Sequence, residues 1–456
     1  MNNLFSYNAS KYSYLHYAIA IAAGMLCGGL YIPVQIVVLV YVLLGALLIF
    51  FAAVNDLTRV FSWMPYLCYL EIWVKDKAPS ALPYSFAQFV MIAIFLALII
   101  KQLPQIHFHT RLFVLTLLFA IIELMNAVGS TYIEYARFLI YNSFYVALIV
   151  IWSSINVITP DLLRRFIYNL KVAGIFLCGI IVVAHVNGEI TYELHSNLQS
   201  TNGLAPNQVA CYLGITAVLF FLSIMSNDDI LSLAINIVLM IFCTTLLALS
   251  FSRGGIYILG GVMGLYFLIN IHKPKTLLFS LILVPVTYVI YQYTTVATGG
   301  AIEERFAMAG TSGRDVLAEA ALTLFKKNIY TGMGTGNFFR GVVGEHLFRF
   351  SSGAHNEFTR VMAEHGLMGM IPYYSFYLVC FVNILKRRQG LAREIGIYFF
   401  TLFFLITIYN ALKISIQPLL LIFAIATPVI QEATAEETVE EDAGADHVLQ
   451  PSNAGQ

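Results

Sequence analysis

Two arginines have the surroundings expected of a phosphate-binding site. Arg253 stands among small residues between two long apolar runs, and Arg314 falls at the start of a predicted amphipathic helix, 316–324. We expect Thr311 or Ser312 to cap that helix. A guanidinium group binds phosphate through two parallel hydrogen bonds, and the first turn of a helix favours anions. The two arginines together therefore predict recognition of a phosphorylated compound.

His355 is the residue that we expect to move a proton. It follows Gly353 and Ala354, and we predict that a helix begins just before it. The positive end of a helix favours the neutral imidazole, which is the form that a general base requires. A hydroxyl group that attacks a phosphate-activated carbon would lose its proton to such a base.

Each of these residues also has a plain structural interpretation. Arg253 can anchor a helix end at the membrane surface, and Arg314 can pair with Asp315 or Glu319. A lone histidine such as His355 often serves only in packing. The chemical interpretation is favoured because all three residues fall on the same predicted side of the membrane.

Other charged and glycine-rich motifs favour structural roles. The glycines at 332, 334 and 336 resemble a nucleotide loop, but no strand precedes them and no helix with Lys-Ser/Thr follows, so we expect a tight turn. Arg360 has helical spacing to Glu357 and Glu364, which predicts an ion pair, and His365 is expected to pack between helices.

Charged residues within apolar runs are costly and therefore informative. Arg137 can meet Glu123 or Glu134 between adjacent helices, and such structural pairing is the default expectation. The alternative is that Arg137 lines a path for lipid headgroups, which would make it a substrate-binding residue.

The composition excludes a water-soluble globule. The 456 residues are 59% hydrophobic and 11% charged, whereas soluble domains carry about 25% charged residues. The formal net charge of zero gives no reason to expect nucleic acid as a partner. The six cysteines lie in apolar segments without metal-ligand spacing, so neither a disulfide framework nor a metal site is expected.

The apolar runs predict an all-α polytopic membrane protein with about 12–14 transmembrane helices and one long loop. The candidate segments are 15–30, 34–54, 58–74, 86–100, 112–125, 136–152, 166–186, 209–225, 231–251, 255–271, 276–293, 358–385, 395–412 and 416–430.

Four regions follow from this pattern. Transmembrane helices occupy 1–293, a long loop with amphipathic helices occupies 294–357, further transmembrane helices occupy 358–430, and 431–456 is an acidic tail expected to be disordered and cytoplasmic. Lysines and arginines at 164–165, 273–275 and 386–388 mark the cytoplasmic side, so the long loop is expected in the periplasm.

Four motifs, taken in order, resemble the bacterial O-antigen ligase and polymerase superfamily. They are Ser252-Arg253-Gly254, Ser312-Gly313-Arg314, Gly332-x-Gly334-x-Gly336-Asn337-Phe338, and His355-Asn356 followed by Glu364-x-Gly366-x-x-Gly369. The resemblance implies a metal-independent, inverting glycosyltransferase of the inner membrane that uses no cofactor. It would move a glycan from undecaprenyl diphosphate to an acceptor on the periplasmic face, in O-antigen, capsule or exopolysaccharide assembly.

The resemblance also implies roles for particular residues. Arg253 and Arg314 would bind the diphosphate, His355 would act on the acceptor hydroxyl, and Asn337 and Asn356 would contact substrate. A repeat-unit polymerase is favoured, and a ligase that transfers glycan to the lipid A-core is second, because family ligases tend to carry an arginine in an earlier outer loop and 187–207 has none. The rival class is a lipid-linked oligosaccharide flippase or other polysaccharide transporter.

Overall fold

The computed structural model describes residues 13–102, 110–187, 190–192, 198–226, 229–307, 313–344, 354–410 and 414–428. The helices are α1 (Ser13–Gly29), α2 (Val34–Ala53), α3 (Leu57–Lys77), α4 (Phe86–Gln102), α5 (Thr110–Met125), α6 (Ile133–Ile155), α7 (Pro160–Val186), the short 3-10 helix η2 (Gln199–Thr201), α8 (Pro206–Ser226), α9 (Ile230–Leu249), α10 (Arg253–Asn270), α11 (Pro274–Ala297), α12 (Ala301–Ala307), α13 (Arg314–Lys327), α14 (Phe338–Gly344), α15 (Glu357–Leu385), α16 (Leu391–Tyr409) and α17 (Ile416–Ile425).

The predicted all-α membrane fold is confirmed. Each of the fourteen predicted apolar segments coincides with a helix, including 58–74, which is α3 despite Pro65 in its interior. Eight of the described helices are long and apolar enough to cross a membrane. Helices are the expected outcome because an apolar run in lipid must satisfy its backbone hydrogen bonds within itself.

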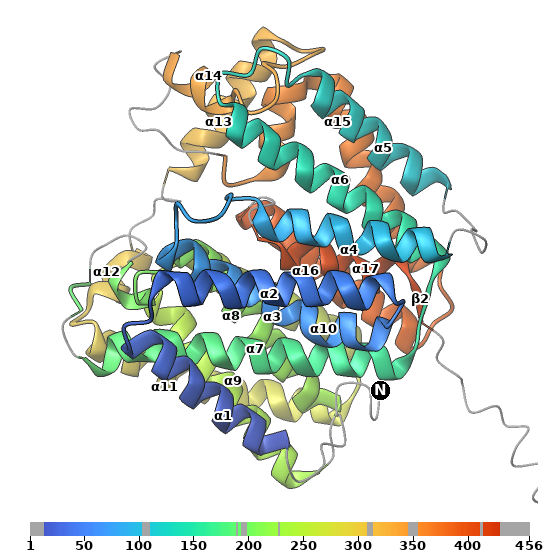
Figure 1. Ribbon diagram of the computed structural model, residues 1–456. Helices are drawn as coiled ribbons and strands as arrows, with labels where there is room; N and C mark the ends of the chain where they lie inside the picture. Colours follow the sequence, from blue (N-terminus) through green and yellow to red (C-terminus); the bar gives the residue numbers. More distant parts are fainter. Residues whose placement is uncertain are drawn as a thin grey trace, which may run out of the picture.

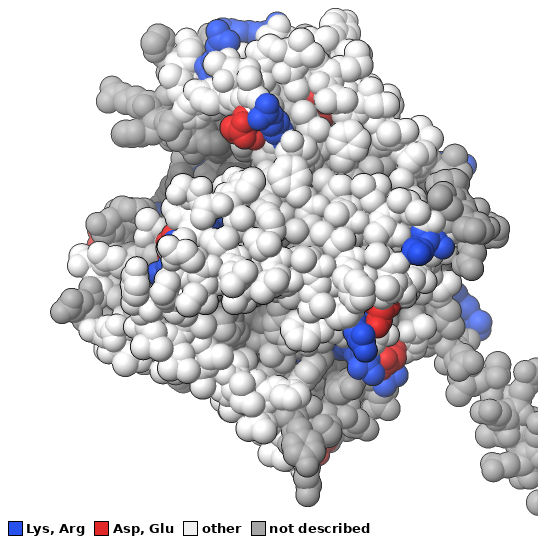
Figure 2. Space-filling model, in the orientation of Figure 1, with Lys and Arg blue, Asp and Glu red and all other residues white. Residues whose placement is uncertain are grey.

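Two helices form the buried centre of the molecule. Helix α8 is buried from Val209 to Ser226 and packs against α7, α9 and α10, while every residue of α17 is buried against α16 and α6. Helix α11, by contrast, exposes large apolar side chains such as Leu281 and Val284. Figure 2 shows a broad uncharged surface between a few charged groups, as a lipid-facing surface requires.

The two ends of the bundle differ. Helices α12, α13 and α14 lie at one end, on the left in Figure 1, and the strands lie at the other. Strands β1 (Val157–Ile158) and β2 (Thr427–Pro428) pair in parallel, with Val157 opposite Thr427. Arg387 closes the same end by donating from Nη2 to the carbonyl oxygens of Ala424 and Ile425, at 2.5 and 2.8 Å.

The glycine run forms a tight loop that is inserted into a break in α15. Gly366 has φ 56° and ψ −152°, which interrupts the helix and leaves backbone groups without helical partners. The N–H groups of Met333 and Gly334 donate to Ala363 and Glu364, at 3.0 and 2.8 Å. In the opposite direction, the N–H groups at 367 and 368 donate to the carbonyls at 329 and 330. The loop therefore completes the hydrogen bonding of the broken helix.

A buried ionic cluster holds α5 against this part of α15. Arg360 lies 2.9 Å from Glu123, 2.5 Å from Glu357 and 2.5 Å from Glu364, and all four side chains are at most 1% exposed. His365 packs edge-on to Phe119 and bonds Asn126 at 3.2 Å. The predicted ion pair of Arg360 is confirmed, with one further carboxylate from α5.

Of the two partners predicted for Arg137, Glu134 is confirmed and Glu123 is wrong. Arg137 pairs with Glu134 at 2.7 Å on the exposed surface of α6, one helical turn away. Glu123 is fully buried, so Arg360 can pair with it away from water, whereas Arg137 is 55% exposed. The acidic tail, 431–456, lies outside the described residues.

Candidate active site

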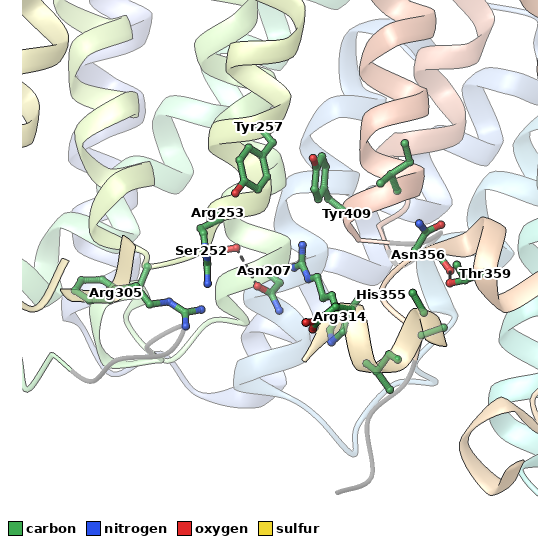
Figure 3. Close-up of a pocket in the computed structure, with 16 residues that line it drawn as sticks. Asn207, Ser252, Arg253, Tyr257, Arg305, Arg314, His355, Asn356, Thr359 and Tyr409 are labelled. Carbon is green, nitrogen blue, oxygen red and sulfur yellow. Dashed lines mark hydrogen bonds between the residues drawn. The ribbon is translucent and has the colours of Figure 1, made fainter. Parts of the chain in front are cut away.

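A pocket of about 560 Å³ opens where several chain segments meet at the end of the bundle that carries α12 and α13. Its side chains come from the start of α8, the α9–α10 turn, α12, α13, the start of α15 and the end of α16. Figure 3 shows this pocket. The lining residues are Asn207, Phe251, Ser252, Arg253, Tyr257, Arg305, Arg314, Asp315, Leu317, Ala318, Ala354, His355, Asn356, Thr359, Ile408 and Tyr409.

Arg253 is placed by a strained turn and a close helix contact. Phe251, just before it, has φ 56°, an unusual value for a bulky residue. Ser252 donates from Oγ to Asn207 at 2.9 Å, which ties the turn to α8. A side chain at Gly255 would overlap the backbone of Ala210, so this glycine lets α10 approach α8 closely. Arg253 is consequently the first residue of α10 and faces the pocket (Figure 3).

Arg314 begins α13, as predicted. The expected caps, Thr311 and Ser312, lie outside the described residues, and Gly313 occupies the N-cap position with φ 77° and no side-chain cap bond. The guanidinium of Arg314 lies 5.8 Å from the centre of the Tyr409 ring. Burial lowers the pKa of Arg314, and the neighbouring charge of Arg253 lowers it further.

Arg305 is a third pocket arginine, which the sequence did not reveal. It comes from α12 and is 9% exposed. Burial lowers its pKa first, and the charges of Arg253 and Arg314 add to the effect. Arg305 follows two glutamates in a polar stretch, so its sequence context is that of an ordinary surface residue. Three guanidinium groups thus face one pocket, with Asp315 as the acidic residue in the described lining.

His355 lines the same pocket but precedes its helix. The prediction that the helix begins before His355 is wrong, because α15 starts at Glu357 with Asn356 as its N-cap. The Asn356 side chain accepts a hydrogen bond from the N–H of Phe358 at 2.9 Å, and this contact caps the start of the helix directly after His355. In Figure 3, His355 and Asn356 lie beside Arg314, on the side away from Arg305.

Two predicted substrate-binding residues are not brought to the pocket. Asn337 accepts from the N–H of Thr131 at 3.1 Å and donates to the carbonyl of Met333 at 3.0 Å, so it joins the glycine loop to the start of α6. Arg137 lies on the exposed face of α6. Neither residue lines the pocket.

Comparison with known families finds a match to part of the chain. Residues 238–374 match the family model described as O-antigen ligase. This segment belongs to the O-antigen ligase family. The predicted resemblance to the O-antigen ligase and polymerase superfamily is therefore confirmed. No curated protein and no solved structure matches the chain.

The segment that matches the O-antigen ligase model contains the arginines and the histidine of the pocket. Arg253, Arg305, Arg314 and His355 all fall within 238–374, whereas Asn207 and Tyr409 come from outside it. Among the residues that the structure describes, no group of three or more His, Cys, Asp or Glu side chains is placed to hold a metal ion. The chain is a multi-pass membrane protein in which residues 238–374 match the O-antigen ligase model.

Proposed function

We propose that this protein transfers a glycan from undecaprenyl diphosphate to a sugar hydroxyl, and that the pocket is its active site. The observation that carries the proposal is the gathering of Arg253, Arg305, Arg314 and His355 from separate segments into one pocket. Three guanidinium groups against one carboxylate leave a formal excess of two positive charges. A diphosphate linking a lipid to a sugar carries one negative charge on each phosphate, so the charges are complementary.

The arginines act on the leaving group. When the bond between the anomeric carbon and the phosphate oxygen breaks, its electron pair remains on the diphosphate. Fixed guanidinium groups stabilise this developing charge without having to reorganise. Their charge persists because an arginine with a lowered pKa remains protonated at neutral pH.

His355 acts on the acceptor. The acceptor oxygen attacks the anomeric carbon from the face opposite the phosphate, and His355 takes the hydroxyl proton as the new bond forms. One direct displacement inverts the anomeric configuration. In this scheme Asn356 fixes the end of the helix next to His355, and the reaction needs no metal ion or cofactor.

The proposed location is the inner membrane, with the pocket facing the periplasm. The support is the distribution of basic residues, since Arg387 lies at the opposite end of the bundle from α12 and α13. The flippase alternative is less well supported. Glu123 and Arg360 are buried and form an ion pair with one another, so they do not line a path across the membrane.

Within this activity, a repeat-unit polymerase is our first proposal, because 187–207 contains no arginine of the kind expected in family ligases. Transfer to the lipid A-core is the second, since the matching family is described as O-antigen ligase. Deleting the gene and examining lipid-linked and surface polysaccharide separates the two. A polymerase deletion leaves single lipid-linked units, and a ligase deletion leaves full-length polymer on its carrier. Normal polysaccharide in the deletion strain would contradict both.

A further inference from the structure

Two tyrosines form an aromatic wall on the side of the pocket where membrane helices enter. Tyr257 and Tyr409 stack with ring centres 5.0 Å apart and an angle of 30° between the planes. Both line the pocket. Tyr257 lies four residues into α10, and Tyr409 is the last residue of α16. Figure 3 shows both rings on the helix side of Arg253 and Arg314.

This wall lies along the route that a lipid chain must take. Tyr257 is one helical turn from Arg253, a rise of about 6 Å along the axis. A diphosphate held by the arginines therefore has its lipid-linked oxygen within reach of the rings. The lipid chain must then turn toward the bilayer, in the direction in which α10 and α16 run.

The exposed surface beyond Tyr257 is apolar. Tyr257 itself is 44% exposed, and Ile408 is a further apolar residue of the pocket lining. On the same face of α10, side chains added at Gly260 or Gly264 would meet no atom within 4 Å, so the space next to the helix is open. An extended hydrocarbon chain fits such a surface, while a sugar would leave its hydroxyl groups without hydrogen-bond partners.

We infer that Tyr257 and Tyr409 form a binding subsite for the first isoprenyl units of the lipid carrier. The inference rests on the proposed function, because it takes the arginines as the diphosphate site. The ring pair would select prenyl diphosphates over other diphosphates by covering the hydrocarbon next to the phosphate. The guanidinium of Arg314 lies over the Tyr409 ring. The tyrosine pair would therefore contact both the lipid chain and an arginine of the diphosphate site.

The test compares two ligands on the purified full-length protein in detergent: farnesyl diphosphate and inorganic pyrophosphate. We expect Tyr257→Ala to weaken farnesyl diphosphate binding about tenfold while changing pyrophosphate binding less than about twofold. Tyr257→Phe keeps the ring and should recover most of the lost affinity. The control is Tyr288→Ala, an exposed tyrosine of α11 that does not line the pocket.

The outcomes separate this inference from the proposed function. If Tyr257→Ala weakens the binding of both ligands equally, or of neither, the proposal of a prenyl subsite is contradicted while the proposal of a diphosphate site is not. If the wild-type protein binds neither ligand, the diphosphate site fails and the subsite with it. A Tyr257→Ala protein that binds farnesyl diphosphate normally but loses affinity for the acceptor glycan would assign the rings to the acceptor sugar instead.

Discussion

The guanidinium groups of Arg253, Arg305 and Arg314 are forced together against their mutual repulsion. Burial first, and then that repulsion, lower the pKa of Arg305 and of Arg314, so the arrangement costs folding free energy. A cost of this kind is typical of a site built for an anion. A planar guanidinium presents two parallel donors, so we expect the shape of these groups to matter as well as their charge.

The first prediction concerns that shape. Arg253→Lys and Arg305→Lys keep the charge but lose the two-donor geometry, so each should lower glycan transfer about ten- to a hundredfold at normal protein levels. Transfer is measured with purified protein and a lipid-linked donor. Arg340→Lys is the control, because Arg340 contacts Thr131 and does not line the pocket. Wild-type activity in both pocket variants would show that these arginines contribute only positive charge and not a specific donor geometry.

The second prediction concerns the proton acceptor. His355→Ala should leave donor binding intact and lower the rate of transfer about a hundred- to ten-thousandfold, because it removes a general base. Donor binding and product formation are measured separately, and the anomeric configuration of the wild-type product is determined by NMR. His272→Ala, in the exposed α10–α11 connection, is the control. A product of retained configuration would exclude direct displacement.

The third prediction concerns metal ions. Since the arginines supply the positive charge that a diphosphate needs, we expect transfer to continue unchanged in excess EDTA. The measurement is the initial rate before and after chelation, followed by addition of Mg²⁺ or Mn²⁺. Loss of activity that either ion restores would contradict the metal-independent scheme.

At the scale of elements, α15 links the pocket to the buried centre. Its first turn follows His355 and carries Arg360, and its break at Gly366 receives the glycine loop. A side chain at Gly332 would overlap the backbone of Glu364 and His365. The position of His355 therefore depends on a loop more than twenty residues earlier in the chain.

The fourth prediction tests this insertion. Gly299→Ala should lower the free energy of unfolding by about 1–2 kcal/mol, which is the cost of holding alanine at a positive φ. No further cost is expected, because nothing lies within 4 Å of the added carbon. Gly332→Ala has the same backbone cost and must also displace α15, which adds about 1–3 kcal/mol. We expect thermal unfolding in detergent to show a clearly larger loss for Gly332→Ala. Equal losses would show that the loop does not support the broken helix.

At the scale of the whole molecule, the two ends of the bundle carry different chemistry. One end holds the arginine pocket, and the other holds Arg387 against the end of α17. The uncharged surface between them suits a bilayer (Figure 2). The orientation of the bundle decides which compartment supplies the acceptor.

The fifth prediction tests that orientation. A cysteine replacing exposed Glu303 on α12 should react with an impermeant maleimide in cells whose outer membrane alone is permeabilised. A cysteine replacing exposed Gln389 should react only after lysis, because basic residues mark that end as cytoplasmic. The unsubstituted protein gives the background of its own cysteines. The reverse pattern would overturn both the topology and the proposed reaction.

The helices could be predicted from the sequence because their cause is local. A run of about twenty apolar residues in lipid has few options besides a helix, so all fourteen segments were recognisable. Arg253, Arg314 and His355 were recognisable because each stands in a short motif. The ion pair of Arg360 with Glu357 and Glu364 followed from helical spacing alone.

Only the tertiary structure decided which residues share the pocket. It brought in Arg305, Tyr257 and Tyr409, left out Asn337 and Arg137, and paired Glu123 with Arg360. It also showed that α15 begins at Glu357, after His355, with Asn356 as its N-cap. The physical reason is that these contacts join segments far apart in the chain. Local periodicity determines which face of a helix is apolar, but packing between helices determines what that face meets.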